Sequence, residues 1–188
     1  MMHMRARRTV AVVAICVLWL GSLAAPSVSQ AKTAAEINAG VDAAIARFDE
    51  TVKGGAKFLA SSKGVLVFPG VVKVAFVIGG QYGEGALREG GQPHGYYSIA
   101  GGSWGASFGI QSKDLLLVFR DRAALRSFEQ ASGWQVGVNG AVTLVNVGVG
   151  ADLSTMQINQ PVVAFVVGQK GLMFDVSLQG AKITRITR

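Results

Sequence analysis

The sequence predicts an α+β fold in which an N-terminal amphipathic helix, kinked or folded as a hairpin, packs on a strongly twisted antiparallel sheet that can curl toward a barrel. Three observations lead to this prediction. Apolar residues between Ile37 and Val52 recur every three to four positions, as in a helix. After Gly64 the pattern changes to runs of β-branched and aromatic residues separated by glycine-rich turns. Few helical segments separate these runs, which favours antiparallel pairing.

Residues 1–31 have the features of an export signal. The segment begins with a basic stretch that contains Arg5, Arg7 and Arg8, and an apolar run follows at residues 10–20. This run is shorter than the roughly 20 residues needed to span a bilayer. Ser29-Gln30-Ala31 resembles a cleavage site, with a cut after Ala24 or Ala25 as the alternative. We therefore expect a signal peptide over residues 1–31 and a single exported domain over residues 32–188, periplasmic or secreted.

Removing this segment changes how the charge and the cysteine content are interpreted. The formal net charge falls from +7 to +4 once the three arginines are removed, so the composition gives little support for nucleic-acid binding. The one cysteine, Cys16, follows Ile15, whereas a lipid-attachment cysteine follows a small residue. We therefore expect no lipid anchor at Cys16, and no disulfide or cysteine-ligated metal in the exported domain.

The first helix is marked at its start, along its length and at its end. Thr33-Ala34-Ala35-Glu36 is a capping box directly behind the expected cleavage point. Gly54-Gly55 is expected to end or kink the helix before a short continuation through Phe58 and Leu59. One apolar stripe lies between these signals: Ile37, Val41, Ile45, Phe48 and Val52.

The strands are expected in several separate runs. Residues 65–68 form a buried type of strand that Pro69-Gly70 should stop before a second run at residues 72–78. A turn at residues 168–171 should join strands 161–167 and 172–178 into a hairpin. Residues 121–130 are expected to form one short helix with Asp121 as its N-cap. Further strands are expected at residues 96–99, 104–110, 115–119 and 181–186.

One segment permits two interpretations. Residues 134–138 and 141–149 flank Asn139-Gly140, which is a strong signal for a tight hairpin. The alternating apolar residues of the same segment also suit one long bent strand. Both alternatives stay open at the level of sequence.

The inventory of reactive side chains argues against an enzyme. His94, within Pro93-His94-Gly95, is the one histidine behind the leader, and no serine lies in a G-x-S-x-G context. The acidic residues are scattered along the chain, unlike the converging ligands of a metal site. Residues 79–85 are glycine-rich but lack the spacing of a phosphate-binding loop. We therefore expect no catalytic activity, no cofactor and no metal.

The distribution of lysines is the main charge feature. No acidic residue occurs between Thr51 and Gly83, and two of the lysines there, Lys53 and Lys57, share a helix face beside Phe58. Such a surface is either simply solvated or attracts anionic lipid headgroups, at about 1 kcal/mol for each lysine near the membrane. The four lysines of this stretch are Lys53, Lys57, Lys63 and Lys73, and a second basic group consists of Arg120, Arg122 and Arg126.

An ordered set of motifs extends over most of the exported domain. It begins with SKGVLVFPGVVK at residues 62–73 and GGQYGEG at residues 79–85. It continues with GGSWG at residues 101–105, QSKDLLLVF at residues 111–119 and GVGAD at residues 148–152. Over roughly residues 34–188 the chain resembles the SYLF domain, also called the Ysc84 actin-binding family, and looks like a bacterial exported member.

The resemblance implies a lipid-binding module. Eukaryotic relatives bind phosphoinositides and membranes through an N-terminal basic amphipathic segment, and some bundle actin filaments. By position, this implies a lipid-facing segment of Lys53, Lys57 and Phe58, with Lys63 and Lys73 nearby. We therefore expect an exported, non-enzymatic module that associates with anionic lipid or an envelope surface, and the alternative is a protein–protein interaction module with actin binding as its precedent.

Overall fold

The computed structural model describes residues 31–76, 78–104, 108–147, 151–153, 158–171 and 178–188. Residues 32–188 form one compact unit. The expected signal peptide lies outside the described residues except for Ala31. Within the described residues, every helix is too short or too polar to cross a membrane.

Two helical segments begin the unit, as the periodicity predicts. Helix α2 (Ala34–Thr51) starts with a complete capping box, in which Thr33 Oγ1 accepts from the Glu36 N–H at 3.2 Å and the Glu36 carboxylate accepts from the Thr33 N–H at 2.7 Å. Gly54 adopts a φ of +82° between β1 (Val52–Lys53) and α3 (Gly55–Ser61), a left-handed conformation that glycine adopts without strain. The expected break at Gly54-Gly55 is therefore confirmed.

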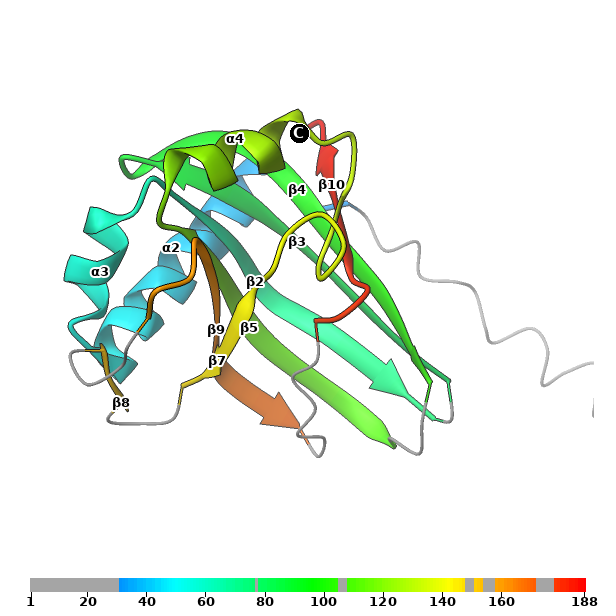
Figure 1. Ribbon diagram of the computed structural model, residues 1–188. Helices are drawn as coiled ribbons and strands as arrows, with labels where there is room; N and C mark the ends of the chain where they lie inside the picture. The colour runs from blue at the N-terminus through cyan, green and yellow to red at the C-terminus, as the bar shows by residue number, and fades with distance from the viewer. Residues whose placement is uncertain (1–30, 77, 105–107, 148–150, 154–157, 172–177) are drawn as a thin grey trace, which may run out of the picture. The chain divides into compact units, whose positions relative to one another are not determined.

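Among the described residues, the rest of the unit is dominated by one strongly curled, half-barrel sheet of eight strands in the order β6-β10-β4-β3-β2-β5-β9-β7 (Figure 1). Neighbouring strands are antiparallel except for β7 and β9, which pair in parallel. The predicted α+β class is thus confirmed, with one parallel pair in an otherwise antiparallel sheet. The strands are β2 (Gly64–Ala75), β3 (Ile78–Glu89), β4 (Gln92–Trp104), β5 (Gly109–Phe119), β6 (Trp134–Gln135), β7 (Thr143–Asn146), β9 (Val162–Gly171) and β10 (Lys182–Ile186).

Two short elements complete the described fold. Strand β8 (Ala151–Asp152) pairs in parallel with β1. Helix α4 (Arg122–Gln130) follows β5, and the Asp121 carboxylate accepts from the Ala124 N–H at 2.7 Å. The expected helix and its N-cap are therefore confirmed.

Each face of the sheet has its own hydrophobic core. Helices α2 and α3 pack on the outer face, where the rings of Phe48 and Phe58 lie 5.0 and 5.6 Å from that of Phe165. Helix α4 packs on the inner face of the curl through Phe128. Both faces are covered at residues 65–68, which explains why these residues form a continuous apolar run rather than an alternating one.

Strand β2 runs through Pro69-Gly70, which we expected to stop it. The register against β3 and β5 shifts at this point, so the dipeptide forms a β-bulge inside a continuous strand. Gly70 has a φ of +62°, and its N–H donates to the Asp114 carboxylate at 2.8 Å. A side chain from the neighbouring strand thus satisfies the donor that the ladder loses.

Other turn predictions fail for a similar reason. Strand β9 continues through residues 168–171, where we expected a turn, and its register against β5 shifts between Ser112 and Asp114. The second strand of that expected hairpin lies outside the described residues except for Leu178. The expected strand 104–110 is divided between the end of β4 and the start of β5, with residues 105–107 outside the described part.

The segment with two interpretations follows neither of them. Strands β6 and β7 occupy opposite edges of the sheet, and a tight turn between them is closed by the Val138 N–H, which donates to the Gln135 carbonyl at 3.1 Å. The short stretch from residue 136 to 142 can join the two edges because the sheet curls.

Candidate functional site

A group of large apolar side chains lies exposed on the outer face of the sheet, at the ends of β2, β3 and β5. Their exposed fractions range from 44% at Val72 to 71% at Phe108. An apolar cluster of this kind on one surface is typical of a docking site. We call this group the distal apolar patch, and it consists of Val72, Val74, Phe76, Ile78, Tyr82, Phe108 and Ile110.

The pairing of the strands brings the patch together. Val72 lies opposite Tyr82 of β3, and Val74 lies opposite Ile110 of β5. The rings of Phe76 and Phe108 are 4.9 Å apart. Because directly opposed residues point to the same side of a sheet, these side chains form one continuous surface.

The bulge and helix α2 explain why the patch is uncovered. The bulge changes the alternation, so that Val71 joins the inner core while Val72 faces outward. Helix α2 passes the bulge closely, since a Cβ on Gly40 would lie 2.9 Å from Pro69. The far ends of the strands project past the helices in Figure 1.

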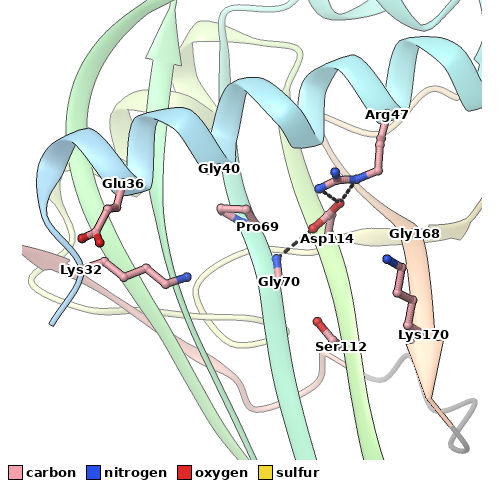
Figure 2. Close-up of a pocket in the computed structure, with 10 residues that line it drawn as sticks. All are labelled: Lys32, Glu36, Gly40, Arg47, Pro69, Gly70, Ser112, Asp114, Gly168 and Lys170. Atoms are coloured by element: carbon pink, nitrogen blue, oxygen red, sulfur yellow. Dashed lines mark hydrogen bonds and ion pairs between the residues drawn. The ribbon is translucent and has the colours of Figure 1, made fainter. Parts of the chain in front are cut away.

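A polar cleft of about 390 Å³ is lined by residues of α2, β2, β5 and β9 (Figure 2). Asp114, which is 5% exposed, accepts from Arg47 Nε at 2.8 Å and from the Gly70 N–H at 2.8 Å. Ser112, opposite Val72, lies where the cleft meets the patch. Since its central carboxylate is already bound by Arg47 and Gly70, the cleft ties α2 to the bulge and supports the patch. The lining residues are Lys32, Glu36, Gly40, Arg47, Pro69, Gly70, Ser112, Asp114, Gly168 and Lys170.

A second polar group limits the patch beside Tyr82. The Glu84 carboxylate accepts from the Tyr82 hydroxyl at 2.8 Å and from Arg188 Nη2 at 2.6 Å. Burial acts to raise the pKa of Glu84, but these hydrogen bonds and the Arg188 charge outweigh it, so the pKa lies below its usual value. Burial, followed by the hydrogen bond to Glu84 and its charge, raises the pKa of Tyr82. The edge of the patch is thus an ionised, hydrogen-bonded rim.

The structure separates the residues that we expected to face lipid. Lys73 is 3% exposed on the inner face and does not belong to a surface patch. Phe58 is partly buried against Phe165 rather than exposed at the end of a helix. Lys53 is exposed but lies 3.3 Å from Asp152. Lys57 and Lys63 are exposed, and within the described residues neither has an ion-pair partner.

The second basic group is also divided among different contacts. Arg120 lies over the ring of Phe58, with 5.8 Å between Cζ and the ring centroid. Arg122 lies 3.7 Å from Glu89, and Arg126 is exposed on α4. The three arginines are all exposed, but the first two are engaged by neighbouring groups and do not form one free cationic surface.

Comparison with known families identifies the C-terminal part of the chain. The family model described as Ysc84, Las17-binding protein actin regulator, matches residues 100–187. These residues belong to the Ysc84 family. The match confirms the family that the motifs indicated, and the family description is that of a binding protein rather than an enzyme. No curated protein matches the sequence.

The residues matched to the Ysc84 family contain part of the distal apolar patch but none of the lysines expected to face lipid. They include Phe108 and Ile110 of the distal apolar patch, together with Asp114 beneath the bulge. The lysines expected to face lipid all lie before residue 100, outside the matched region. The distal apolar patch could not be read from the sequence, since residues 72–78 look like an ordinary strand whichever face is exposed.

Proposed function

We propose that this protein is a non-enzymatic binding module that docks onto a protein partner through the distal apolar patch. The observation that supports the proposal most directly is the exposed pair of rings, Phe76 and Phe108, whose centroids lie 4.9 Å apart. Large aromatic side chains at the centre of an interface supply much of its binding energy. The description of the Ysc84 family makes actin and Las17-like proteins the first partners to test.

The surroundings of the patch suit a protein interface. Burying one large apolar side chain contributes about 1.5–3 kcal/mol, so a few of these residues suffice for specific binding. The charged rim of Glu84 and Arg188 can supply orientation, since the rims of protein interfaces are polar. Val72, Val74 and Ile110 of the patch lie on paired strands, so little conformational entropy is lost at these residues on binding.

The first prediction concerns the double variant Phe76→Ser/Phe108→Ser. In co-sedimentation with actin filaments, residues 32–188 should bind, and the double variant should bind at least about tenfold more weakly because it loses both exposed rings. Val138→Ser is the matched control, since Val138 is 71% exposed outside the patch. Equal binding by the parent and the double variant, or no binding of the parent to actin or to a Las17-type protein, contradicts the proposal.

A second candidate function is association with anionic lipid at the corner formed by α3 and the start of β2. Lys57 and Lys63 support it, since both are exposed in the acid-free segment. Lys53 contributes less because Asp152 partly neutralises it, and Lys73 is buried. Export to the periplasm or the medium, which would place this corner near an envelope surface, is part of this proposal and rests on the sequence of residues 1–31.

The second prediction separates the lipid candidate from the protein candidate. Lys57→Gln/Lys63→Gln should weaken binding of residues 32–188 to phosphatidylserine-containing vesicles about fivefold, since two surface lysines contribute up to about 2 kcal/mol before salt screening. Binding to purely phosphatidylcholine vesicles should be weak for both proteins. Lys182→Gln, an exposed lysine on β10, is the control. If the double variant binds vesicles as well as the parent, or if Lys182→Gln loses as much binding, this corner is not the lipid-binding site.

A further inference from the structure

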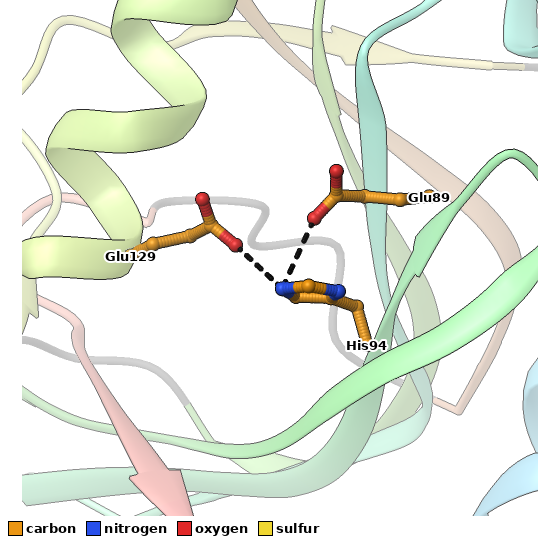
Figure 3. A group of neighbouring side chains, drawn as sticks. All are labelled: Glu89, His94 and Glu129. Carbon is orange, nitrogen blue, oxygen red and sulfur yellow. Dashed lines mark ion pairs between the residues drawn. The ribbon is translucent and has the colours of Figure 1, made fainter.

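We infer that Glu89, His94 and Glu129 form a binding site for a divalent transition-metal ion, with zinc as the best fit. The three side chains converge from different parts of the chain (Figure 3). His94 Nε2 lies 3.4 Å from Glu89 Oε1 and 3.1 Å from Glu129 Oε1. All three ligand atoms lie within 4.8 Å of one another.

The backbone explains this convergence. Glu89 ends β3, and the turn at Gly90-Gly91 leads directly into β4. Leu87 pairs with Gly95 and Arg88 with Pro93, so His94 is the extra residue of a β-bulge. A bulge redirects its side chain out of the regular alternation. Glu129 comes from α4, which Phe128 fixes to Tyr97 of β4 at 5.0 Å between ring centroids.

The two separations from His94 Nε2, 3.4 and 3.1 Å, are close to those between ligands of a tetrahedral ion. Zinc binds imidazole nitrogen and carboxylate oxygen at about 2.0–2.2 Å, and two ligands at the corners of such a tetrahedron lie about 3.3–3.5 Å apart. One imidazole and two carboxylates balance the charge of a divalent ion and leave a fourth position for water. His94 is about half exposed, so an ion can reach the site from solvent.

The hydrogen bonding supplies an independent argument. Glu89 Oε1 is a buried atom that has no hydrogen-bond partner among the described residues. Imidazole Nε2 carries at most one proton, yet two carboxylate oxygens face it. An ion among the three atoms satisfies all of them at once. Arg122 Nη1 lies 3.7 Å from the other oxygen, Glu89 Oε2, and can orient this carboxylate from outside the site.

The bound ion would link the β3–β4 hairpin to the last turn of α4. The third prediction is that one zinc ion binds per full-length chain in isothermal titration calorimetry. A zinc concentration about a hundredfold above Kd should raise Tm by about 5–10 °C, since the ion binds the folded state, and EDTA should reverse the rise. Substituted cobalt(II) should show the visible absorption of a tetrahedral centre.

Variants locate the ion on the full chain. His94→Ala and Glu129→Gln should each weaken zinc binding at least tenfold, because even the loss of an outer-shell partner costs ten- to a hundredfold. Glu50→Gln removes a comparable carboxylate outside the cluster and should bind zinc like the parent. Circular dichroism shows whether His94→Ala folds. If His94→Ala does not fold, the zinc affinity of Glu129→Gln still tests the site. No zinc binding up to millimolar concentration, or binding that both cluster variants retain, overturns the site.

Discussion

Phe128→Ala is expected to lower the free energy of unfolding by about 3–5 kcal/mol, the usual range for removing a buried phenylalanine ring. Phe128 is 2% exposed, and its ring lies 5.0 Å from those of Tyr97 and Phe119 and 5.8 Å from that of Trp134. No neighbouring backbone can collapse into the space, because paired strands hold the surrounding rings. Urea unfolding followed by tryptophan fluorescence measures the change.

The control for Phe128→Ala is the same substitution, phenylalanine to alanine, at an exposed position. Phe76→Ala removes a ring that is 69% exposed and should change the free energy of unfolding by less than about 0.5 kcal/mol. A Phe128→Ala variant as stable as Phe76→Ala would show that α4 does not depend on this ring. Because Phe128 also holds Glu129 over the β3–β4 hairpin, the buried variant should lose zinc affinity as well.

Asp114→Ala is expected to cost about 2–4 kcal/mol of stability. The carboxylate is the acceptor for Arg47, at 2.7 Å from Nη2, and for the Gly70 N–H of the bulge, at 2.8 Å. Removing it leaves the Gly70 donor unsatisfied in a largely buried setting, which costs about 1–3 kcal/mol, and also removes a charge-assisted hydrogen bond. Arg47 is half exposed and can be hydrated, which keeps the loss below that of a fully buried ion pair.

A comparison of two ion pairs tests the reason for this loss. Lys53→Ala removes an ion pair whose lysine is 80% exposed, and it should have little effect on the melting temperature. Similar losses for Asp114→Ala and Lys53→Ala would contradict a structural role of Asp114. Amide hydrogen exchange at Gly70 should accelerate in Asp114→Ala but not in Lys53→Ala.

The sequence by itself determined the elements whose signals are local. The capping box at Thr33 and Glu36, the N-cap at Asp121 and the break at Gly54 each involve groups within a few residues of one another. The α+β class also followed from sequence, because the change of apolar period after Gly64 reflects the helix and strand geometries themselves. The order of motifs indicated the Ysc84 family, which the match at residues 100–187 confirms.

Only the tertiary structure decided which side chains face solvent and which groups meet. Lys73 and Lys57 look alike in sequence, yet Lys73 is buried because the bulge at Pro69-Gly70 sets which face of β2 it occupies. That bulge depends on the Asp114 carboxylate, 44 residues away. His94 reads as an isolated turn residue until β3, β4 and α4 bring two glutamates to it. The physical reason is the same in each case, since contacts between distant strands leave no trace in the local pattern of either strand.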